Sequence, residues 1–571
     1  MFVAERPPFT RGLEAELNSL CEHPAASLRG TALGSLVGVR IDDEGRHPDH
    51  AGPPLEVLPL NHEQKSAVER SLRSPLTVIT GPPGTGKSQV VSSILLNAAH
   101  QGQRVLFASK NNKAVDVVEA RVNSLGPRPL LMRLGANAYQ DKIVDFLTKI
   151  LSVSCSEQDE LAYDAQLRIH ARIAERIEKM QSDVDSYAEI LSALSERARQ
   201  LELERSVRGA NTLERLADLD SERLPAIATE LRRTLVLLSP SPSGVLRKLS
   251  ARFLGARRVE KFEARADSWR SELDALGVRL PEGFQVDELS RWEDAADEIE
   301  DLAGVQHLLR AQERDLASFS SLTSLEELAK QESELAEQIE EVSDRLWRLW
   351  LVLQPARLTQ EQRRLVGEYA STLRTLQEQA RESGRRATGF AKKYSELFPQ
   401  ISEVLPCWAV TSLSVHRRVP LSPGFFDLVV IDEASQCDIA SIVPLLYRAR
   451  RAVIIGDPQQ LRHISALRQD QNGRLLEKHG LADNHLLWDY VNSSLYDLGA
   501  PLAAAEDVVD LREHHRSHSD IIEFSNRAFY EGKLRVATRY SKLKPTPGEA
   551  AVRWVQASGR VERVATGGSR N

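Results

Sequence analysis

Eight residues have the types and the spacing of a phosphate-binding loop. Residues 81–88 read GPPGTGKS and match the pattern GxxxxGK[ST]. A short apolar run at 76–80 precedes them, and a helical pattern follows. In this context, backbone N–H groups of the loop and of the helix N-terminus point at phosphate. The residues expected to bind the phosphates are Gly81, Pro82, Pro83, Gly84, Thr85, Gly86, Lys87 and Ser88.

Four side chains have separate expected roles in phosphoryl transfer. Lys87 would reach the outer phosphates of ATP, and the Ser88 hydroxyl would ligate Mg²⁺. A second pair, Asp432 and Glu433, stands at the end of an apolar run at 426–431. Asp432 would hold the Mg²⁺ through water, and Glu433 would orient or deprotonate the attacking water.

A third polar stretch accompanies these motifs. Residues 456–461 read GDPQQL and follow the apolar run 452–455. In isolation this sequence is that of an ordinary Asp-Pro turn. At the carboxyl end of a neighbouring parallel strand, it would face the same ligand as the phosphate-binding loop. We expect Gln460 to sense the γ-phosphate there.

Apolar runs that alternate with helical patterns must position these residues. The alternation occurs at 56–150 and again at 405–500, and it is typical of βαβ units in a parallel sheet. We therefore predict an α/β fold, with one parallel-sheet domain built from two halves. Residues 1–55 are predicted to form an N-terminal helical segment and a linker.

A long helical insertion is predicted between the two halves, at 151–404. From 157 to 205 neither Gly nor Pro interrupts the chain, and apolar residues recur at steps of three and four. Residues 322–353 show the same spacing of apolar residues. The simplest topology is an antiparallel coiled-coil hairpin whose tip lies around 240–283.

Composition restricts the classes of function. The chain has 571 residues, a formal net charge of −7, and 27 % charged but only 5 % aromatic residues. These proportions favour a helix-rich protein and exclude a uniformly basic nucleic-acid coat, while a local basic groove remains compatible with them. The four cysteines form no CxxC pair, and no apolar run approaches the ~20 residues of a membrane span. We expect an intracellular, cytoplasmic protein that does not insert into a membrane.

Taken in order, the motifs resemble those of superfamily 1 DNA/RNA helicases, which are AAA-type P-loop ATPases, in the branch of senataxin and the nonsense-mediated-decay helicase. GPPGTGKS, DEASQ and GDPQQL resemble motifs I, II and III. LNHEQKSAV at 60–68 resembles the Q motif, and NKAVD at 112–116 resembles motif Ia. LREHHRSHSDIIEFSNRAFYEGKL at 511–534 resembles the motif that opens a second RecA-like domain.

The resemblance implies an ATP-dependent helicase or translocase with ATP and Mg²⁺ as cofactors and single-stranded DNA or RNA as partner. It implies two RecA-like domains, with residues 501–571 forming part of the second. By the same resemblance, Gln64 reads adenine, Asn112 and Thr411 contact nucleic acid, and Arg516 reaches the γ-phosphate. Movement would run from five-prime to three-prime, and the insertion would offer a site for a protein partner.

The sequence departs from the family pattern in three places. His515 stands where the family has Tyr, and Arg462-His463 follow motif III where Pro is usual. No residues resembling motifs V and VI follow Leu534, so the second domain is expected to be cut short. Because motif VI carries an arginine, and an arginine finger contributes ~10³–10⁵ in rate, we expect this chain to hydrolyse ATP slowly.

Two other classes of function compete with this interpretation. The first is an ATP-gated scaffold that acts through its helical insertion, which would bind ATP without stimulation by nucleic acid. The second is a coiled-coil chromosome-organising ATPase, which also carries a helical hairpin inside its ATPase domain. That class requires an LSGG-type signature after the returning helix, and the sequence has none.

Overall fold

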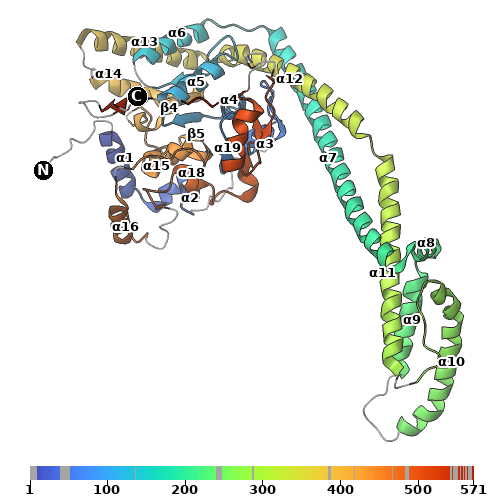
Figure 1. Ribbon diagram of the computed structural model, residues 1–571. Helices are drawn as coiled ribbons and strands as arrows, with labels where there is room; N and C mark the ends of the chain where they lie inside the picture. The colour runs from blue at the N-terminus through green and yellow to red at the C-terminus, as the bar shows by residue number, and fades with distance from the viewer. Residues whose placement is uncertain are drawn as a thin grey trace. The chain divides into compact units, whose positions relative to one another are not determined.

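The computed structural model describes residues 10–38, 52–134, 137–238, 247–285, 288–383, 388–416, 418–465, 467–481 and 488–540, with short stretches between 543 and 570. The chain divides into two compact units (Figure 1). Met1–Ala174 and Ala336–Asn571 form the first, called here the sheet unit. Glu175–Leu335 form the second, called here the helical unit.

A seven-stranded sheet organises the sheet unit. Its strands neighbour one another in the order β3-β4-β2-β5-β6-β1-β7, and every pairing is parallel. The predicted α/β fold with a parallel sheet is thus confirmed, and it is a RecA-like P-loop domain with a helical insertion. The strands are β1 (Leu76–Thr80), β2 (Val105–Ser109), β3 (Leu131–Arg133), β4 (Cys407–Thr411), β5 (Phe426–Asp432), β6 (Ala449–Gly456) and β7 (Val508–Asp510).

The order of the strands shows how distant parts of the chain form one sheet. Strands β1 to β3 come from the first predicted half and interleave with β4 to β6 from the second. The insertion connects β3 to β4, which are adjacent at one edge. At the opposite edge, β7 pairs with β1, so three residues from the range 501–571 complete this first sheet.

Helices cover both faces of the sheet, as a parallel sheet requires. Side chains of β2 alternate between the faces: Leu106 and Ala108 point into the main core, together with side chains from α2, α6, α13, α14, α15 and α18. Helices α4 and α5 also contact β2, and α5 contacts β3 and β4 as well. The helices named here are α2 (Ala32–Leu36), α4 (Lys87–His100), α5 (Asn112–Asn123), α6 (Asn137–Leu151), α13 (Gln360–Ser383), α14 (Thr388–Val404), α15 (Ile439–Tyr447) and α18 (Leu495–Gly499).

The helical unit is smaller than the predicted insertion 151–404. Helices α13 and α14 lie within that range, yet their apolar side chains belong to the core of the sheet unit. Only residues 175–335 form the separate unit. The sequence of 151–404 predicts helices throughout, but the last two, α13 and α14, turn their apolar faces toward the sheet.

The helical unit has a hydrophobic core of its own. Its side chains include Trp292, Leu231 and Leu273, all fully buried. The predicted tip at 240–283 contains a long helix, α10, in addition to turns; residues 239–246 lie outside the described part. The helices that form this unit or lead into it are α7 (Glu157–Arg208), α8 (Ala210–Asp218), α9 (Arg223–Leu238), α10 (Arg247–Ala275), α11 (Leu289–Ser321) and α12 (Leu325–Ala356).

A buried ion pair fastens the N-terminal helix to the sheet unit. The guanidinium of Arg448 is fully buried and pairs with Glu16 of α1 (Thr10–Glu22). It also donates to the carbonyl oxygens of Val419 and Pro420. Most of the predicted linker at 41–54 lies outside the described residues.

Short elements follow β7 along the chain. Strand β8 (Glu513–His514) pairs in parallel with β9 (Arg535–Val536), and α19 (Ser519–Phe529) lies between them in sequence. The remaining described elements are α3 (His62–Arg73), α16 (Gln469–Lys478), β10 (Glu562–Arg563), β11 (Ser569–Arg570), and the 3₁₀ turns η1 (Ala25–Leu28), η3 (Ser412–Ser414), η4 (Ala434–Gln436) and η6 (Ala505–Asp507). None of the described helices is both long and apolar enough to cross a membrane.

Candidate functional site

The carboxyl ends of the parallel strands bring the predicted motifs to one edge of the sheet. In register, Ser109 at the end of β2 lies beside Asp432 on one side and Thr411 on the other. Thr80 at the end of β1 lies beside Gly456 of β6. Ligands of open α/β sheets bind beyond this edge, where loops leave the strands.

The loop between β1 and α4 has the backbone geometry of an anion-binding turn. Gly84 and Gly86 both have φ of 84°, a conformation that L-residues with a side chain rarely adopt. The N–H of Gly81 donates to the carbonyl oxygen of Gly456 at 2.9 Å, which ties the loop to β6. The ammonium of Lys87 donates to the carbonyl oxygen of Gly81 at 2.5 Å and so folds back over the loop.

Gln64 contacts this loop directly. It is nearly buried, and its side-chain amide donates to the carbonyl oxygen of Thr85 at 3.0 Å. Its amide oxygen closes a capping box with Asn61 at the start of α3. A Cβ on Gly86 would stand 2.4 Å from the Gln64 amide nitrogen and would displace it, and the φ of 84° at this position also favours glycine. In this structure, the predicted adenine reader therefore braces the phosphate loop.

The two carboxylates at the end of β5 differ in burial. Asp432 is 5 % exposed, and burial together with the charge of Glu433 raises its pKa to about 6, although Lys87 acts in the opposite direction. The next residue, Glu433, has a φ of 56°, and its N–H donates to Asp432. Its carboxylate accepts from the amide of Gln436 at 3.2 Å.

Asp457, at the start of the loop that follows β6, links three segments. Its N–H donates to the Ser435 hydroxyl at 2.7 Å. Its carboxylate accepts from the Gln460 amide at 3.0 Å and from the Tyr530 hydroxyl at 2.8 Å. Gln460, the predicted γ-phosphate sensor, is thus held by Asp457 in this structure. Burial and the neighbouring Asp457 raise the pKa of Tyr530.

The segment around β8 rests on the phosphate loop. His514 donates from Nδ1 to the carbonyl oxygen of Pro83 at 2.9 Å, and the N–H of His515 donates to that of Gly84 at 2.9 Å. Burial lowers the pKa of His514, which favours the neutral ring. A Cβ on Gly84 would lie 2.7 Å from the Cβ of Arg516, so the exposed Arg516 begins beside the loop.

The two predicted nucleic-acid contacts follow neighbouring strands at the same edge. Asn112 is exposed at the first turn of α5, after β2, and its side-chain oxygen accepts from Arg133 at 2.7 Å. Thr411 ends β4, and its hydroxyl lies 2.7 Å from that of Ser414. Since β2 and β4 are adjacent, the structure places both residues on one side of Asp432.

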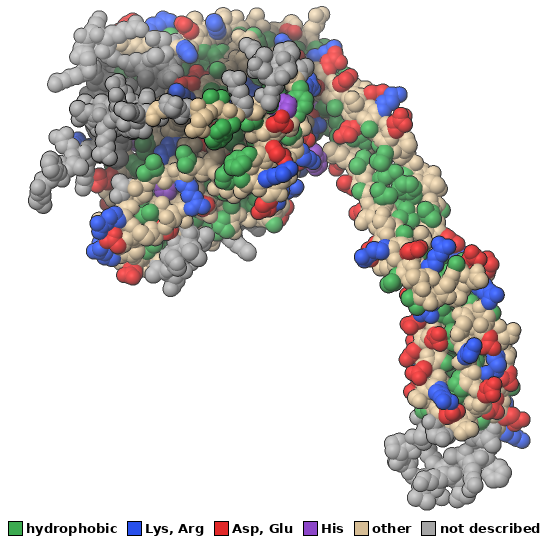
Figure 2. Space-filling model, viewed as in Figure 1, with side chains coloured by type: hydrophobic (Ala, Val, Ile, Leu, Met, Phe, Trp, Pro, Cys, Tyr) green, Lys and Arg blue, Asp and Glu red, His purple; other side chains and the backbone are tan. Residues whose placement is uncertain are grey.

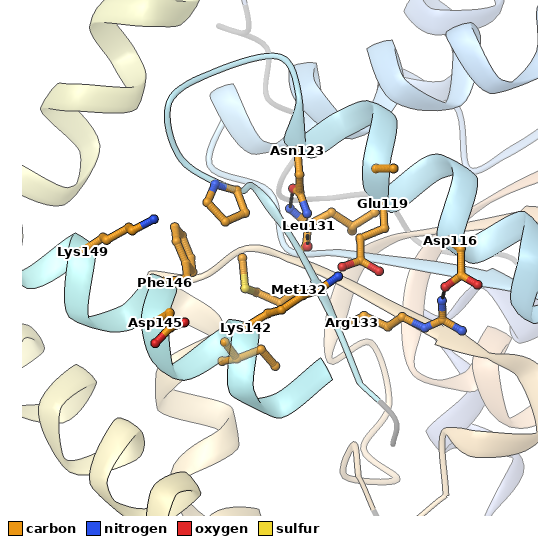
Figure 3. A pocket seen from close by; sticks show the side chains of 13 residues that line it. Asp116, Glu119, Asn123, Leu131, Met132, Arg133, Lys142, Asp145, Phe146 and Lys149 are labelled. Atoms are coloured by element: carbon orange, nitrogen blue, oxygen red, sulfur yellow. Dashed lines mark hydrogen bonds and ion pairs between the residues drawn. The ribbon is translucent and has the colours of Figure 1, made fainter. Parts of the chain in front are cut away.

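A cavity of about 610 Å³ lies beside α5, outside the phosphate loop (Figure 3). Its wall includes Met132 and Arg133 of β3, Glu119 of α5, and Lys142 and Phe146 of α6. Burial raises the pKa of Glu119, and the charge of Lys142 opposes that rise.

Sequence reasoning missed several residues of this site. Asp457, His514 and Tyr530 lie inside stretches that resemble family motifs, but no role was predicted for them within the ATP site, and Arg133 lies in none of these stretches. Asn61, which caps α3, could have been recognised from the sequence, because an Asn followed three residues later by a Gln is typical of a helix start.

The arrangement combines groups that suit a nucleotide. Loop N–H groups, Lys87 and Arg516 offer donors and positive charge to an anion. Asp432 offers a buried carboxylate to a hard cation. Within the described residues, no group of three or more His, Cys, Asp or Glu side chains is arranged to hold a metal ion.

Comparison with known proteins identifies the family. A family model described as "AAA domain" matches residues 59–238 and 285–464. The chain is 32 % identical over 113 residues to a regulator of nonsense transcripts 1 homolog of Arabidopsis thaliana, which covers 19 % of this chain and 9 % of the plant protein. It is 30 % identical over 151 residues to an uncharacterized ATP-dependent helicase of Mycoplasma genitalium, covering 26 % and 13 %.

A third relative is the DNA-binding protein SMUBP-2 of Mus musculus, 36 % identical over 104 residues, covering 18 % of this chain and 10 % of the mouse protein. The alignments thus span about a tenth of the length of these curated relatives. The family model, by contrast, matches well over half of this chain. The chain belongs to the superfamily 1 helicases, in the branch of the regulators of nonsense transcripts, and carries their AAA domain.

Proposed function

We propose that the chain is a nucleic-acid-dependent ATPase that couples ATP hydrolysis to movement along single-stranded DNA or RNA. One observation carries the proposal: the phosphate loop, the buried Asp432 and the Arg516 segment meet at one edge of the sheet. Asn112 and Thr411 stand at the same edge, where β5 and β6 lie between Asn112 and the strand of the phosphate loop, and β2 also lies between that strand and Thr411. A nucleotide at the loop and a strand at these residues would contact one rigid sheet.

Within the ATP site we propose the roles that the family resemblance implies, for side chains in the positions described above. Lys87 would release the Gly81 carbonyl and bind the outer phosphates, and Arg516 would add positive charge where negative charge develops. Glu433 would orient the attacking water. Gln460 would sense the γ-phosphate by exchanging its bond to Asp457 for one to the nucleotide, and Gln64 would hold the loop and read adenine.

The residues fit a magnesium ion. Mg²⁺ typically takes one or two carboxylates, water and substrate phosphates rather than an all-protein cage. Asp432 supplies a buried carboxylate, whose pKa is raised by burial and by Glu433 and lowered by Lys87. Asp432 and the Ser88 hydroxyl would hold the ion, which would neutralise charge on the phosphates.

An ATPase assay of the 571-residue chain tests the proposal. Turnover is measured with single-stranded DNA, with single-stranded RNA and without nucleic acid. We expect stimulation by at least one strand and loss of all turnover in Lys87→Ala. The matched control, Lys179→Ala, removes an exposed lysine from α7 and should behave like the wild type. Turnover that survives Lys87→Ala would contradict the assignment of the phosphate loop.

The ATP-gated scaffold remains the second candidate. It is favoured by the helical unit, because that unit has its own core and could present a stable surface to a protein partner. The same assay separates the two functions: a scaffold would bind ATP normally and show no stimulation by either strand. Directional unwinding assays with five-prime and three-prime tails would then test the expected five-prime to three-prime movement.

A further inference from the structure

Arg133 is a buried cation at the open edge of the sheet. It is the last residue of β3, which is an edge strand, and only 3 % of it is exposed. Its guanidinium reaches the first turn of α5. There it donates to the side-chain oxygen of Asn112 at 2.7 Å and to the backbone oxygen of the same residue at 3.5 Å.

Asp116 completes this arrangement. It lies one turn after Asn112 on α5, and its carboxylate pairs with the Arg133 guanidinium. Figure 3 shows Arg133 extending from β3 to Asp116. A buried guanidinium needs a charged partner, because desolvation is costly when the charge is unpaired. Asp116 therefore keeps Arg133 at the end of α5, where it meets Asn112.

The bond to Arg133 determines which group Asn112 can present. A carboxamide has an acceptor oxygen on one side and an amino group with two donors on the other. Since the oxygen of Asn112 is held by a charged donor, its amino group is the one left for an external ligand. The oxygens of phosphate and sugar along a nucleic-acid strand are acceptors, so they suit this orientation.

We propose that Arg133 is a positioning residue for strand binding, which locks the exposed Asn112 with its amino group presented to the nucleic acid. The inference rests on the proposed function, in which Asn112 contacts the strand. It gives a role in nucleic-acid binding to Arg133, which ends the three-residue edge strand β3 and would itself contact neither ATP nor the nucleic acid. Asp116 contributes indirectly, because its carboxylate holds the guanidinium of Arg133 in place.

A purely structural role would be to fasten α5 to the edge of the sheet. A double-mutant cycle separates the two roles, because residues that act through one another are not additive. The variants are Asn112→Ala, Arg133→Met and the double variant, each in the 571-residue chain. The affinity for a fluorescein-labelled single-stranded oligonucleotide is measured by anisotropy, and the affinity for a fluorescent ATP analogue is measured in parallel.

We expect each single variant to bind the oligonucleotide about tenfold more weakly, which is the size of one charge-assisted hydrogen bond. The double variant should bind no more weakly than Asn112→Ala alone, and ATP affinity should be unchanged throughout. The matched control is Arg121→Met, which removes a cation of α5 that donates to Gln89 and does not touch Asn112. It should leave the affinity for the oligonucleotide unchanged.

Three outcomes would overturn the inference: additive losses of about a hundredfold in the double variant, an equal loss of ATP affinity in Arg133→Met, or wild-type strand affinity in Arg133→Met. If Arg133→Met does not fold, Arg133→Lys keeps the charge without the forked geometry and should give a partial loss. Wild-type strand affinity in Asn112→Ala itself would instead contradict the proposed role of Asn112 in strand binding.

Discussion

The phosphate-loop edge of the sheet unit and the core of the helical unit are ordered in different ways. At the edge, backbone groups and single side chains from α3, β6 and β8 bind the loop one by one, as Gln64 does at Thr85. In the helical unit, apolar side chains fill a shared interior, and the charged residues stay outside. Over this unit, Figure 2 shows acidic and basic side chains interspersed, with apolar side chains between them.

This difference teaches where each region is sensitive. A loop held by individual hydrogen bonds loses its geometry when one bonding atom is displaced, because each position has one partner and no second contact to replace it. A packed core loses stability in proportion to the volume removed and tolerates changes at its surface. Four experiments test the contrast, from the largest expected effect to the smallest.

Trp292→Ala should have the largest effect on stability. The side chain is fully buried in the helical unit, and loss of a buried Trp costs about 3–5 kcal/mol. Hydrogen exchange measured by mass spectrometry should show faster exchange in peptides of 175–335 and no change around the phosphate loop. Trp292→Phe is the matched control: it keeps most of the ring and removes a buried N–H that has no hydrogen-bond partner. Equal exchange in both variants would contradict a core centred on this residue.

Asp432→Asn should stabilise the sheet unit. The pKa of Asp432 is raised from 3.8 to about 6, so its proton is bound more tightly in the folded state. The associated stability is present below about pH 4 and is lost as pH rises to about 6, a change of about 3 kcal/mol at most. The variant should therefore unfold at higher denaturant concentration than the wild type at pH 7, without hydrolysing ATP. A lower midpoint at pH 7 would contradict the cost of burying the charged form of this carboxylate.

A pair of glycine variants compares the two regions at matched backbone conformations. Gly84 and Gly277 both have positive φ, so alanine costs about 1–2 kcal/mol at either position. A Cβ at Gly84 would meet the ring of His514 at 2.6 Å, whereas one at Gly277 meets nothing within 4 Å. We expect Gly84→Ala to weaken ATP binding about tenfold and Gly277→Ala to leave it unchanged. Titration with a fluorescent ATP analogue measures both, and equal affinities would refute the contrast.

Arg232→Ala should have the smallest effect. Arg232 pairs with Asp297 and Glu300 on the surface of the helical unit, and all three side chains are largely exposed. Exposed ion pairs contribute little because water and salt screen them. Denaturation midpoints of the variant and the wild type should agree at high salt. A marked shift there would mean that this surface is more rigid than its exposure indicates.

The chemistry-bearing residues were predictable because their signals are local. The phosphate loop carries its whole pattern within 81–88, and Asp432 follows an apolar run typical of a buried strand. The structure confirms the parallel α/β sheet, although it gives Gln64 and Gln460 protein partners where nucleotide contacts are expected. Their roles toward ATP stay predictions.

The residues that sequence reasoning missed depend on contacts between distant segments. Tyr530 reaches Asp457 across 73 residues of chain, and His514 reaches Pro83 across 431. No periodicity reports such a pairing. Helices α13 and α14 were assigned to the insertion for a similar reason: their pattern shows an apolar face, and only the fold shows that this face covers the sheet.

Helix α4 begins at Lys87 in the phosphate loop and ends at His100, whose ring nitrogen lies 2.8 Å from the hydroxyl of Tyr163 on α7. The same ring stands 6.0 Å, centroid to centroid, from Trp350 on α12. A helix of 14 residues is about 21 Å long and stiff over that length. It therefore connects the phosphate loop with the two helices that carry the chain into and out of residues 175–335.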